Sequence, residues 1–266
     1  MKRILSAIAA AAIVFACAPK NGPVTDVQTM TSPDGNMEMT FQLTADGTPQ
    51  YALSYGDQKV ILPSDLGFEL RGVLKAQKLI YNADGTISKE AREPCNSFYD
   101  GFTVESVETA TFDETWEPVW GEEARIRNNY NELLVNLIQN STERKMAIRF
   151  RLYNDGVAFR MKTSLPGEIE VMQENTILQL ADECNLVLQQ PGGFKTGCEE
   201  EYSFVKSSEW RKEDRMTELP ILIMGKNQKI LFREFDLVNY PGLFLKGNAD
   251  NSLSAIQPKT PLEYED

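Results

Sequence analysis

The stretch from Trp116 to Leu133, WEPVWGEEARIRNNYNEL, concentrates side chains that could contact a sugar. Aromatic planes stack on the apolar face of a sugar ring, and carboxylates and amides hydrogen-bond its hydroxyls. The candidate residues are Trp116, Trp120, Glu122, Asn128, Asn131 and Glu132. The same composition is also typical of a structural surface in which Arg125 and Arg127 pair with neighbouring glutamates. The residues alone leave both interpretations open.

A second candidate is the run Cys198-Glu199-Glu200-Glu201-Tyr202. Adjacent carboxylates repel one another unless water or a cation screens them, so the run is either a solvated face or part of a Ca²⁺ site. One contiguous run cannot surround a cation that takes six to eight oxygens. A calcium site here would therefore need ligands from other segments.

The composition excludes several kinds of chemistry. The chain has no histidine, which removes Ser-His-Asp and Cys-His nucleophile systems, histidine general bases and histidine metal sites. Carboxylates, Lys, Tyr or an oxygen-bound metal remain. The formal net charge is −12, and −14 once Lys2 and Arg3 are removed. Such a chain repels phosphate backbones, so we expect no nucleic-acid partner.

The first 26 residues predict export and a lipid anchor. Lys2 and Arg3 precede an apolar run at residues 4–15 that is too short to span a bilayer, which is typical of a signal peptide, here residues 1–16. Val14-Phe15-Ala16-Cys17 resembles a lipobox, with Cys17 as the lipidation site; a plain secretory signal is the alternative. Residues 17–26 are expected to form the tether. We expect a lipoprotein of the periplasm or outer membrane.

Three further cysteines, Cys95, Cys184 and Cys198, follow Cys17. An odd number in an oxidising compartment leaves at least one unpaired within the chain. The turn-rich segment between Cys184 and Cys198 favours a disulfide between these two, with three buried thiols as the alternative.

The elements that must position these side chains are strands, because apolar residues recur at every second position between turn dipeptides. Residues 37–43 and 51–55 predict one hairpin, and residues 148–152 and 157–161 predict another around Asn154-Asp155-Gly156. Further strands are expected at residues 132–138, 169–172, 176–180, 186–188, 220–224 and 229–235. Only residues 206–213 could make a short turn of helix. The pattern predicts an all-β fold, a large antiparallel β-sandwich over residues 27–266.

The second hairpin has two contrasting faces. Its apolar face is expected to hold Ile148, Phe150, Leu152, Val157, Phe159 and Met161. The opposite face holds Arg149, Arg151, Arg160 and Lys162. We predict that this cationic ladder is solvated or ion-paired rather than an anion site.

Several separated motifs, in order, resemble the N-terminal domain of glycoside hydrolase family 97, the exported α-glucosidases and α-galactosidases of Bacteroidetes. They are Ser32-Pro33-Asp34-Gly35, then YDGFTVESVETATFDETWEPVWGEEARIRNNYNEL at residues 99–133, then IRFRLYNDGVAFRMK at residues 148–162. Residues 232–240, FREFDLVNY, are similar to the strand that closes this domain. The resemblance extends from about residue 27 to about residue 245.

This resemblance implies a galactose-mutarotase-like sandwich (super-sandwich), followed in complete members by a catalytic (β/α)8 barrel and a small β-domain that this sequence lacks. The catalytic carboxylates belong to the barrel, so no catalytic residue is assigned here and this chain alone is expected to be inactive. The sandwich packs on the barrel, supplies part of the active-site rim and donates one glutamate ligand to a Ca²⁺ ion. That ligand matches Glu201, by alignment on the Glu-Tyr pair after Pro191-Gly192-Gly193.

Two departures from the family pattern are visible. Asn129 stands where the family has a histidine in Arg-Asn-His-Tyr-Asn-Glu. The segment Gly197-Cys198-Glu199-Glu200 is also atypical, which affects the register at Glu201.

Three functional hypotheses follow. The first is the N-terminal domain of an exported α-glycosidase that hydrolyses non-reducing α-glucosides or α-galactosides, with an α-linked oligosaccharide and its own barrel as partners. The second is a standalone lipid-anchored carbohydrate-binding module. The third, a mutarotase-like epimerase, is disfavoured because such enzymes need a histidine.

Overall fold

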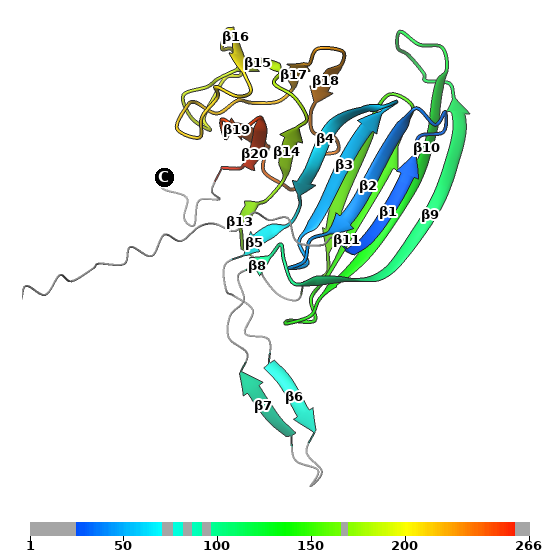
Figure 1. Cartoon of the computed structure of the whole chain (residues 1–266), viewed down its shortest axis with the longest axis vertical. Coiled ribbons are helices and arrows are strands. Elements are labelled where there is room, and N and C mark those ends of the chain that lie inside the picture. Colours follow the sequence, from blue (N-terminus) through cyan, green and yellow to red (C-terminus); the bar gives the residue numbers. More distant parts are fainter. Residues whose placement is uncertain (1–24, 71–76, 82–86, 92–96, 166–169, 259–266) are drawn as a thin grey trace, which may run out of the picture.

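The computed structural model describes residues 25–70, 77–81, 87–91, 97–165 and 170–258 (Figure 1). Within these ranges the chain is all-β, and its strands pair antiparallel without any helix. The predicted signal peptide, Cys17 and Cys95 lie outside the described residues. The described part contains no helix with the length and apolar character that a membrane span requires.

The first half of the described chain contains β1 (Thr25–Thr31), β2 (Met37–Leu43), β3 (Pro49–Tyr55), β4 (Gln58–Asp65), β5 (Phe68–Leu70), β6 (Gln77–Tyr81), β7 (Ile87–Ala91), β8 (Ser97–Phe98), β9 (Phe102–Trp116) and β10 (Ile126–Gln139). The second half contains β11 (Lys145–Leu152), β12 (Val157–Thr163), β13 (Val171–Glu174), β14 (Ile177–Leu180), β15 (Asn185–Gln189), β16 (Tyr202–Lys206), β17 (Ile221–Met224), β18 (Lys229–Phe232), β19 (Phe244–Gly247) and β20 (Ser252–Ile256).

Two sheets form the sandwich. One has the order β1-β2-β3-β4-β14-β20-β19, and the other has the order β12-β11-β10-β9. Aromatic rings from both sheets meet between them: the ring centroid of Phe150 lies 6.2 Å from that of Phe41 and 6.4 Å from that of Tyr51. Tyr51 also packs on Phe159 at 5.5 Å. The predicted antiparallel sandwich is therefore confirmed, and its core lies between these sheets.

Both predicted hairpins are present. In β2 and β3 the register pairs Met37 with Tyr55 and Leu43 with Pro49. The turn between them brings Gly47 against the backbone of Phe102, where an added Cβ would lie 2.5 Å from the Phe102 nitrogen. Because Gly47 also has a φ of +80°, only glycine fits there without strain.

The second hairpin presents the two faces that its sequence predicts. Ile148, Phe150 and Leu152 are fully buried, and the apolar residues of β12 pack on the same core. On the other face, Glu132 lies 3.3 Å from Arg149 and 2.8 Å from Arg151. Arg160 pairs with Asp236. Three of the four cations of the ladder, Arg149, Arg151 and Arg160, are thus ion-paired rather than free to bind an anion.

Three smaller sheets complete the described fold: β13-β5-β8, β16-β15-β17-β18, and the β6-β7 ribbon. The predicted helical turn at residues 206–213 is not a helix. The Lys206 carbonyl accepts hydrogen bonds from the amides of Glu209 (3.0 Å) and Trp210 (3.1 Å), and the turn stops there. Trp210 is fully buried and draws this loop into the core, which explains the single turn.

Candidate functional site

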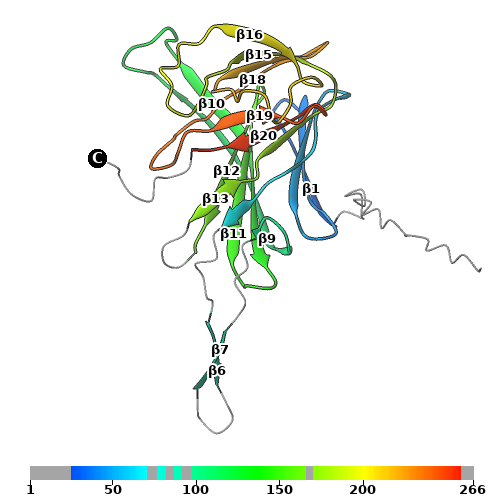
Figure 2. The ribbon, with the colours of Figure 1, turned by 90° about the vertical axis from the view of Figure 1, so that its left-hand side faces the viewer.

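The Trp116–Leu133 stretch forms a long hairpin arm, defined here as β9, the loop at residues 117–125, and β10. β9 and β10 are 15 and 14 residues long and extend past the shorter strands beside them. Two views place the tip of this arm at the same end of the molecule as the β16-β15-β17-β18 sheet (Figures 1 and 2). At the tip, Val119 is completely exposed and Trp120 is 88% exposed. No described residue covers them.

The arm sorts the predicted sugar-contacting residues into three groups. Trp116, Asn128 and Glu132 share one face, because the register pairs Trp116 with Ile126 and alternate residues of a strand share a face. Trp120 and Glu122 lie in the exposed tip.

Asn131 lies on the opposite face and is not part of a common surface with the others. Its side-chain amide donates to the Thr31 carbonyl of β1 at 2.8 Å, so its role here is to join the arm to the other sheet. Glu132 is also engaged in ion pairs with Arg149 and Arg151, and only 14% of its side chain is exposed. Of the six candidates, Trp116, Trp120, Glu122 and Asn128 make no side-chain hydrogen bond to another described residue.

The ion pairs of the arm follow the structural interpretation in part. Arg125 pairs with Glu117 at 3.1 Å, as expected of a neighbouring glutamate. Arg127 instead takes an aspartate: its Nε and Nη2 lie 2.8 and 2.6 Å from the two carboxylate oxygens of Asp113. This two-pronged contact with Arg127 holds the pKa of the Asp113 carboxyl below its usual value. Asn129, which stands where the family has a histidine, pairs with Asp113 in the register. It therefore lies on the same face of the arm as Asp113 and Arg127.

An aromatic cluster outside the main core anchors the base of the arm. Tyr130 is only 7% exposed, although it lies on the outer face of its sheet. Its ring stacks on Phe112 at 5.2 Å and meets Tyr153 at 5.2 Å, while the Arg151 guanidinium lies 4.5 Å above it. The hydrogen bond to Glu132 holds the Arg151 guanidinium in place beside the ring and raises the pKa of Arg151.

The motifs that carry the family resemblance meet in space. In the first motif, the Ser32 hydroxyl donates to Asp34 at 2.6 Å and accepts from the Met37 amide at 2.9 Å. The Asp34 amide donates to the side chain of Asn154, which belongs to the turn of the third motif. The middle motif is tied to the residue just before the first motif, because the Asn131 side chain donates a hydrogen bond to the Thr31 carbonyl. The motifs are therefore framework that fixes the arm to the sandwich.

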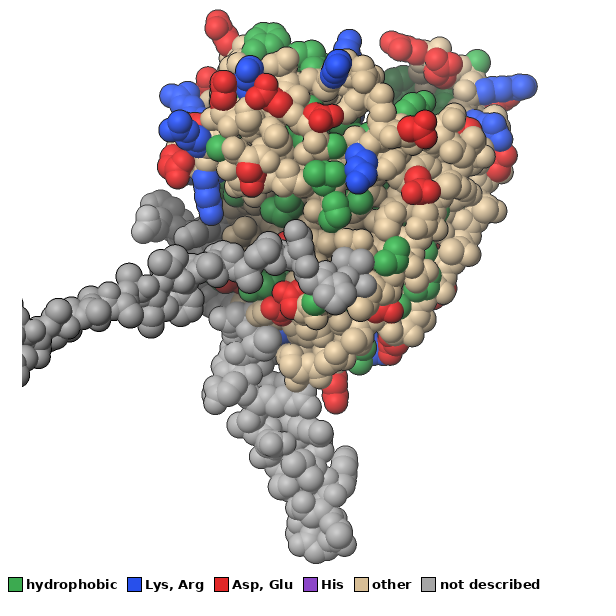
Figure 3. Space-filling model, viewed as in Figure 1, with side chains coloured by type: hydrophobic (Ala, Val, Ile, Leu, Met, Phe, Trp, Pro, Cys, Tyr) green, Lys and Arg blue, Asp and Glu red, His purple; other side chains and the backbone are tan. Residues whose placement is uncertain are grey.

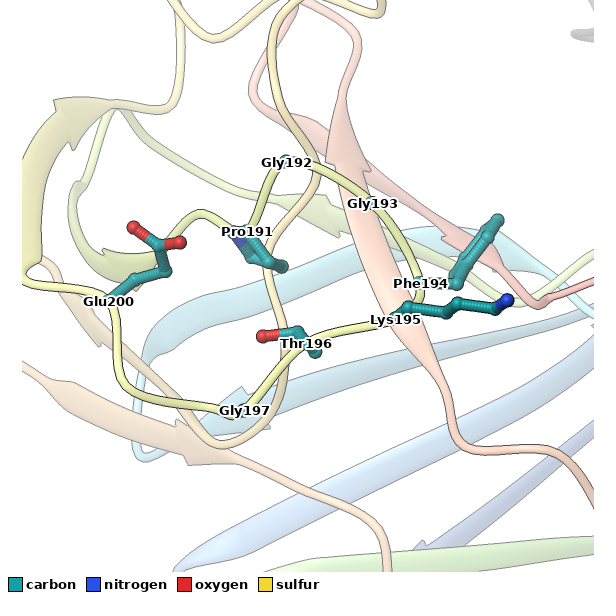
Figure 4. Close-up of a pocket in the computed structure, with 8 residues that line it drawn as sticks. All are labelled: Pro191, Gly192, Gly193, Phe194, Lys195, Thr196, Gly197 and Glu200. Carbon is teal, nitrogen blue, oxygen red and sulfur yellow. The ribbon is translucent and has the colours of Figure 1, made fainter.

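The loop at residues 190–201 carries the predicted calcium ligand. It borders a shallow cavity of about 560 Å³ lined by Pro191, Gly192, Gly193, Phe194, Lys195, Thr196, Gly197 and Glu200. Phe194 and Lys195 point away from the side on which Glu200 lies (Figure 4). Phe194 fixes the loop by an edge contact with Phe244, at 5.2 Å between ring centroids. Glu201 is exposed and directly precedes β16.

The donor set tests whether these residues suit Ca²⁺. Carboxylate oxygens are its preferred ligands, and Glu201 offers a free, exposed carboxylate. The described residues contain no group of three His, Cys, Asp or Glu side chains that could hold a metal. One glutamate supplies at most two of the six to eight oxygens. Glu201 therefore fits as one ligand of a site completed by other ligands.

The predicted disulfide is wrong. Cys184 is buried and free, and Cys198 is exposed and free. Cys184 belongs to the core below β15, whereas Cys198 lies on the loop surface with a φ of +57°. The turn-rich sequence between them forms a wide loop around the cavity rather than a tight return, so it does not bring them together.

Glu218 is a site residue that the sequence does not reveal. It is only 6% exposed, and its carboxylate oxygens have no nitrogen or oxygen donor within hydrogen-bond distance among the described residues. The thiol of Cys198 lies beside it, and this contact with Glu218 raises the pKa of that thiol, with smaller contributions from burial and from the charge of Glu199. A thiol is a weak donor, so the hydrogen-bonding capacity of the buried Glu218 carboxyl is poorly satisfied.

The fold and the arm together define a large antiparallel β-sandwich domain. Residues 30–262 match the family model for the glycosyl-hydrolase 97 N-terminal domain. The chain therefore belongs to this family.

Similar proteins agree with this assignment. A retaining alpha-galactosidase of Bacteroides thetaiotaomicron is 25% identical over 249 residues, covering 88% of this chain and 32% of the relative. A glycoside hydrolase family 97 enzyme from Pseudoalteromonas sp. strain K8, solved with acarbose, superposes with a TM-score of 0.69 at 21% identity, covering 88% of this chain and 32% of that one. A beta-arabinopyranosidase structure superposes with a TM-score of 0.70 at 18% identity, covering 88% and 36%. The chain spans about a third of these proteins.

Proposed function

We propose that this chain is the barrel-packing N-terminal domain of an exported α-glycosidase that hydrolyses non-reducing α-glucosides or α-galactosides. The family match over residues 30–262 carries the proposal. The similar proteins support an activity on glycosides, because one is a retaining alpha-galactosidase and another is a glycoside hydrolase family 97 enzyme solved with acarbose. Each is about three times the length covered here, which is room for a catalytic domain.

In this proposal the domain contributes one calcium ligand and part of the active-site rim. Glu201 donates its exposed carboxylate to Ca²⁺, and acidic groups of the barrel complete the shell. The bound ion would supply positive charge near the substrate. Trp116, Trp120 and Glu122 form the rim at the tip of the arm, with aromatic planes for a sugar ring and oxygens for its hydroxyls.

The direct test is hydrolysis of 4-nitrophenyl α-glucoside and α-galactoside by the polypeptide that contains this domain and the sequence following it. The 266-residue chain alone serves as the control and is expected to be inactive. Absence of turnover of either substrate by the longer polypeptide would contradict the proposal.

The exposure of Trp120 and Trp116 favours one alternative, a standalone carbohydrate-binding module. Calorimetry with maltooligosaccharides on the 266-residue chain separates the two. We expect no saturable binding, because the rim needs the barrel to form a pocket. Binding that disappears in Trp120→Ala would favour the module instead.

We also propose that Cys17 is lipidated and anchors the exported protein to a membrane. The apolar run at residues 4–15 and the Ala16-Cys17 pair support this. Cys17→Ser should move the protein from the membrane fraction to the soluble fraction, and unchanged fractionation would contradict it.

A further inference from the structure

An exposed thiol and a buried carboxyl meet at the loop formed by residues 190–201. Cys198 is free and lies on the surface of this loop, where its amide donates a hydrogen bond to the Thr196 hydroxyl at 3.0 Å. Glu218 is only 6% exposed, and its carboxyl lies beside the Cys198 thiol. A sulfur donor and a carboxylate donor therefore share one place beside the loop.

Gln189, at the end of β15, holds both parts of this pair in position. Its carbonyl accepts hydrogen bonds from the Glu218 amide at 3.2 Å and from the Thr217 hydroxyl at 2.8 Å. Its side-chain amide donates to the Glu200 carbonyl at 2.7 Å. One residue thus binds both the segment before β17 and the end of the loop. The framework, and not a chance contact of mobile side chains, brings the carboxyl to the thiol.

The Glu218 carboxyl has no cation beside it in the described part of the chain. Its oxygens have no nitrogen donor within hydrogen-bond distance, so no described Lys or Arg side chain donates to them. Lys195 points away from the side of the cavity on which Glu200 lies (Figure 4). The charge of Glu199 also acts on the Cys198 thiol.

The surroundings of the pair favour a cation. Acidic side chains are spread, among basic ones, over the end of the molecule that carries the β16-β15-β17-β18 sheet (Figure 3). The whole chain has a formal net charge of −12. A negative protein attracts cations, and an opposite charge would compensate the buried carboxylate.

We propose that Cys198 and Glu218 form a binding site for a thiophilic divalent cation, Zn²⁺. Thiolate sulfur and carboxylate oxygen are both zinc ligands, whereas Ca²⁺ takes oxygen ligands. On binding, a Zn–S bond forms, the thiol proton leaves to solvent, and the ion compensates the carboxylate. No third His, Cys, Asp or Glu side chain of the described residues joins the pair, so water fills the rest of the tetrahedral shell. The ion fastens the loop to the segment before β17.

The first test is protection of Cys198 from iodoacetamide by Zn²⁺ in the 266-residue chain, followed on the Cys198 peptide by mass spectrometry. Two ligands supply about half of the binding free energy of a four-ligand site, so half-protection is expected on the order of 1–100 µM Zn²⁺. Glu218→Gln should need at least about tenfold more Zn²⁺, with each protein compared with its own rate without metal. Glu213→Gln removes an exposed carboxylate and should match wild type. Alkylation that Zn²⁺ does not slow in wild type, or slows equally in Glu218→Gln, would overturn the inference.

Co²⁺ provides a second readout, because it accepts the same ligands as Zn²⁺ and reports a bound thiolate by a charge-transfer band in the near ultraviolet. The band should be present in wild type and absent in Cys198→Ser, an exposed substitution that should leave the fold intact. Excess Ca²⁺ should not remove it. A band of equal intensity in Cys198→Ser, or one that Ca²⁺ abolishes, would also overturn the inference. Neither readout uses hydrolysis or Glu201, so the zinc site and the proposed function can fail separately.

Discussion

Replacing Glu218 by methionine should stabilise the 266-residue chain. Glu218 is 6% exposed, and the weak thiol donor of Cys198 is the one donor beside its carboxyl among the described residues, so folding removes it from water with little compensation. An unsatisfied buried polar group costs about 1–3 kcal/mol, and exchanging a buried charge for an apolar group of similar volume is often stabilising. We therefore expect Glu218→Met to raise the free energy of unfolding by about 1–3 kcal/mol. With a urea m-value near 2 kcal/mol/M, the midpoint should rise by roughly 0.5–1.5 M.

Two measurements check this prediction. The first is urea unfolding followed by tryptophan fluorescence, with Glu213→Met as the control because Glu213 is an exposed carboxylate nearby and its loss should change little. The second is alkylation of Cys198 by iodoacetamide at pH 8, followed by peptide mass spectrometry. Since Glu218 raises the pKa of this thiol, its removal should increase the thiolate fraction and the alkylation rate. A variant less stable than wild type, with an unchanged alkylation rate, would refute the claim that Glu218 is poorly hydrogen-bonded and lies next to Cys198.

Three more outcomes are expected. Tyr130→Ala should lower the free energy of unfolding by about 3–4 kcal/mol in urea titrations, because it empties the aromatic cluster at the base of the arm; a loss below about 1 kcal/mol would show that the cluster is dispensable. Burial, and to a lesser extent the charge of Glu174, raises the pKa of Glu234 above its usual 4.5, so the folded state keeps a proton that the unfolded state releases and stability falls as the pH rises above about 4.5. Glu234→Gln should therefore be the more stable protein at pH 7 and lose that advantage at pH 4, and an advantage independent of pH would contradict this cause. Cys184 and Cys198 should both be alkylated in the denatured, unreduced chain, whereas a mass that shows the two peptides linked would contradict the free thiols.

The sequence predicts the sandwich well where one face of a strand is buried. The alternation in residues 148–161 leads directly to the observed register of β11 and β12, because a one-residue slip would turn every apolar side chain to solvent. β9 could not be found in this way. Most of its 15 residues are exposed, so its sequence lacks the alternation of apolar and polar residues that reveals a half-buried strand. The segment is a strand because it pairs with β10.

The candidate site was predictable in part. Residue type predicts the candidate sugar-contacting residues, but type does not show which face of β10 each one occupies. Asn131 hydrogen-bonds to β1, and Glu132 forms ion pairs with two arginines of β11. Both contacts arise because β10 lies beside these strands in space, which the local sequence does not show. Strand β17 did leave a signal, since Ile221–Met224 is apolar at every position, as in a strand buried on both sides. Glu218 left no such signal, because the sequence around one glutamate does not show whether its side chain is buried.

The most direct test of the central proposal is the calcium dependence of α-glycoside hydrolysis by the longer polypeptide, measured with wild type, Glu201→Gln and the control Glu213→Gln. We predict that wild type and the control lose activity to a chelator and regain it with the same Ca²⁺ concentration. Glu201→Gln should need at least about tenfold more Ca²⁺, which corresponds to the loss of roughly 1.4 kcal/mol from one carboxylate ligand. Calcium dependence in Glu201→Gln identical to that of wild type would contradict the proposal that this domain completes the metal site of an α-glycosidase.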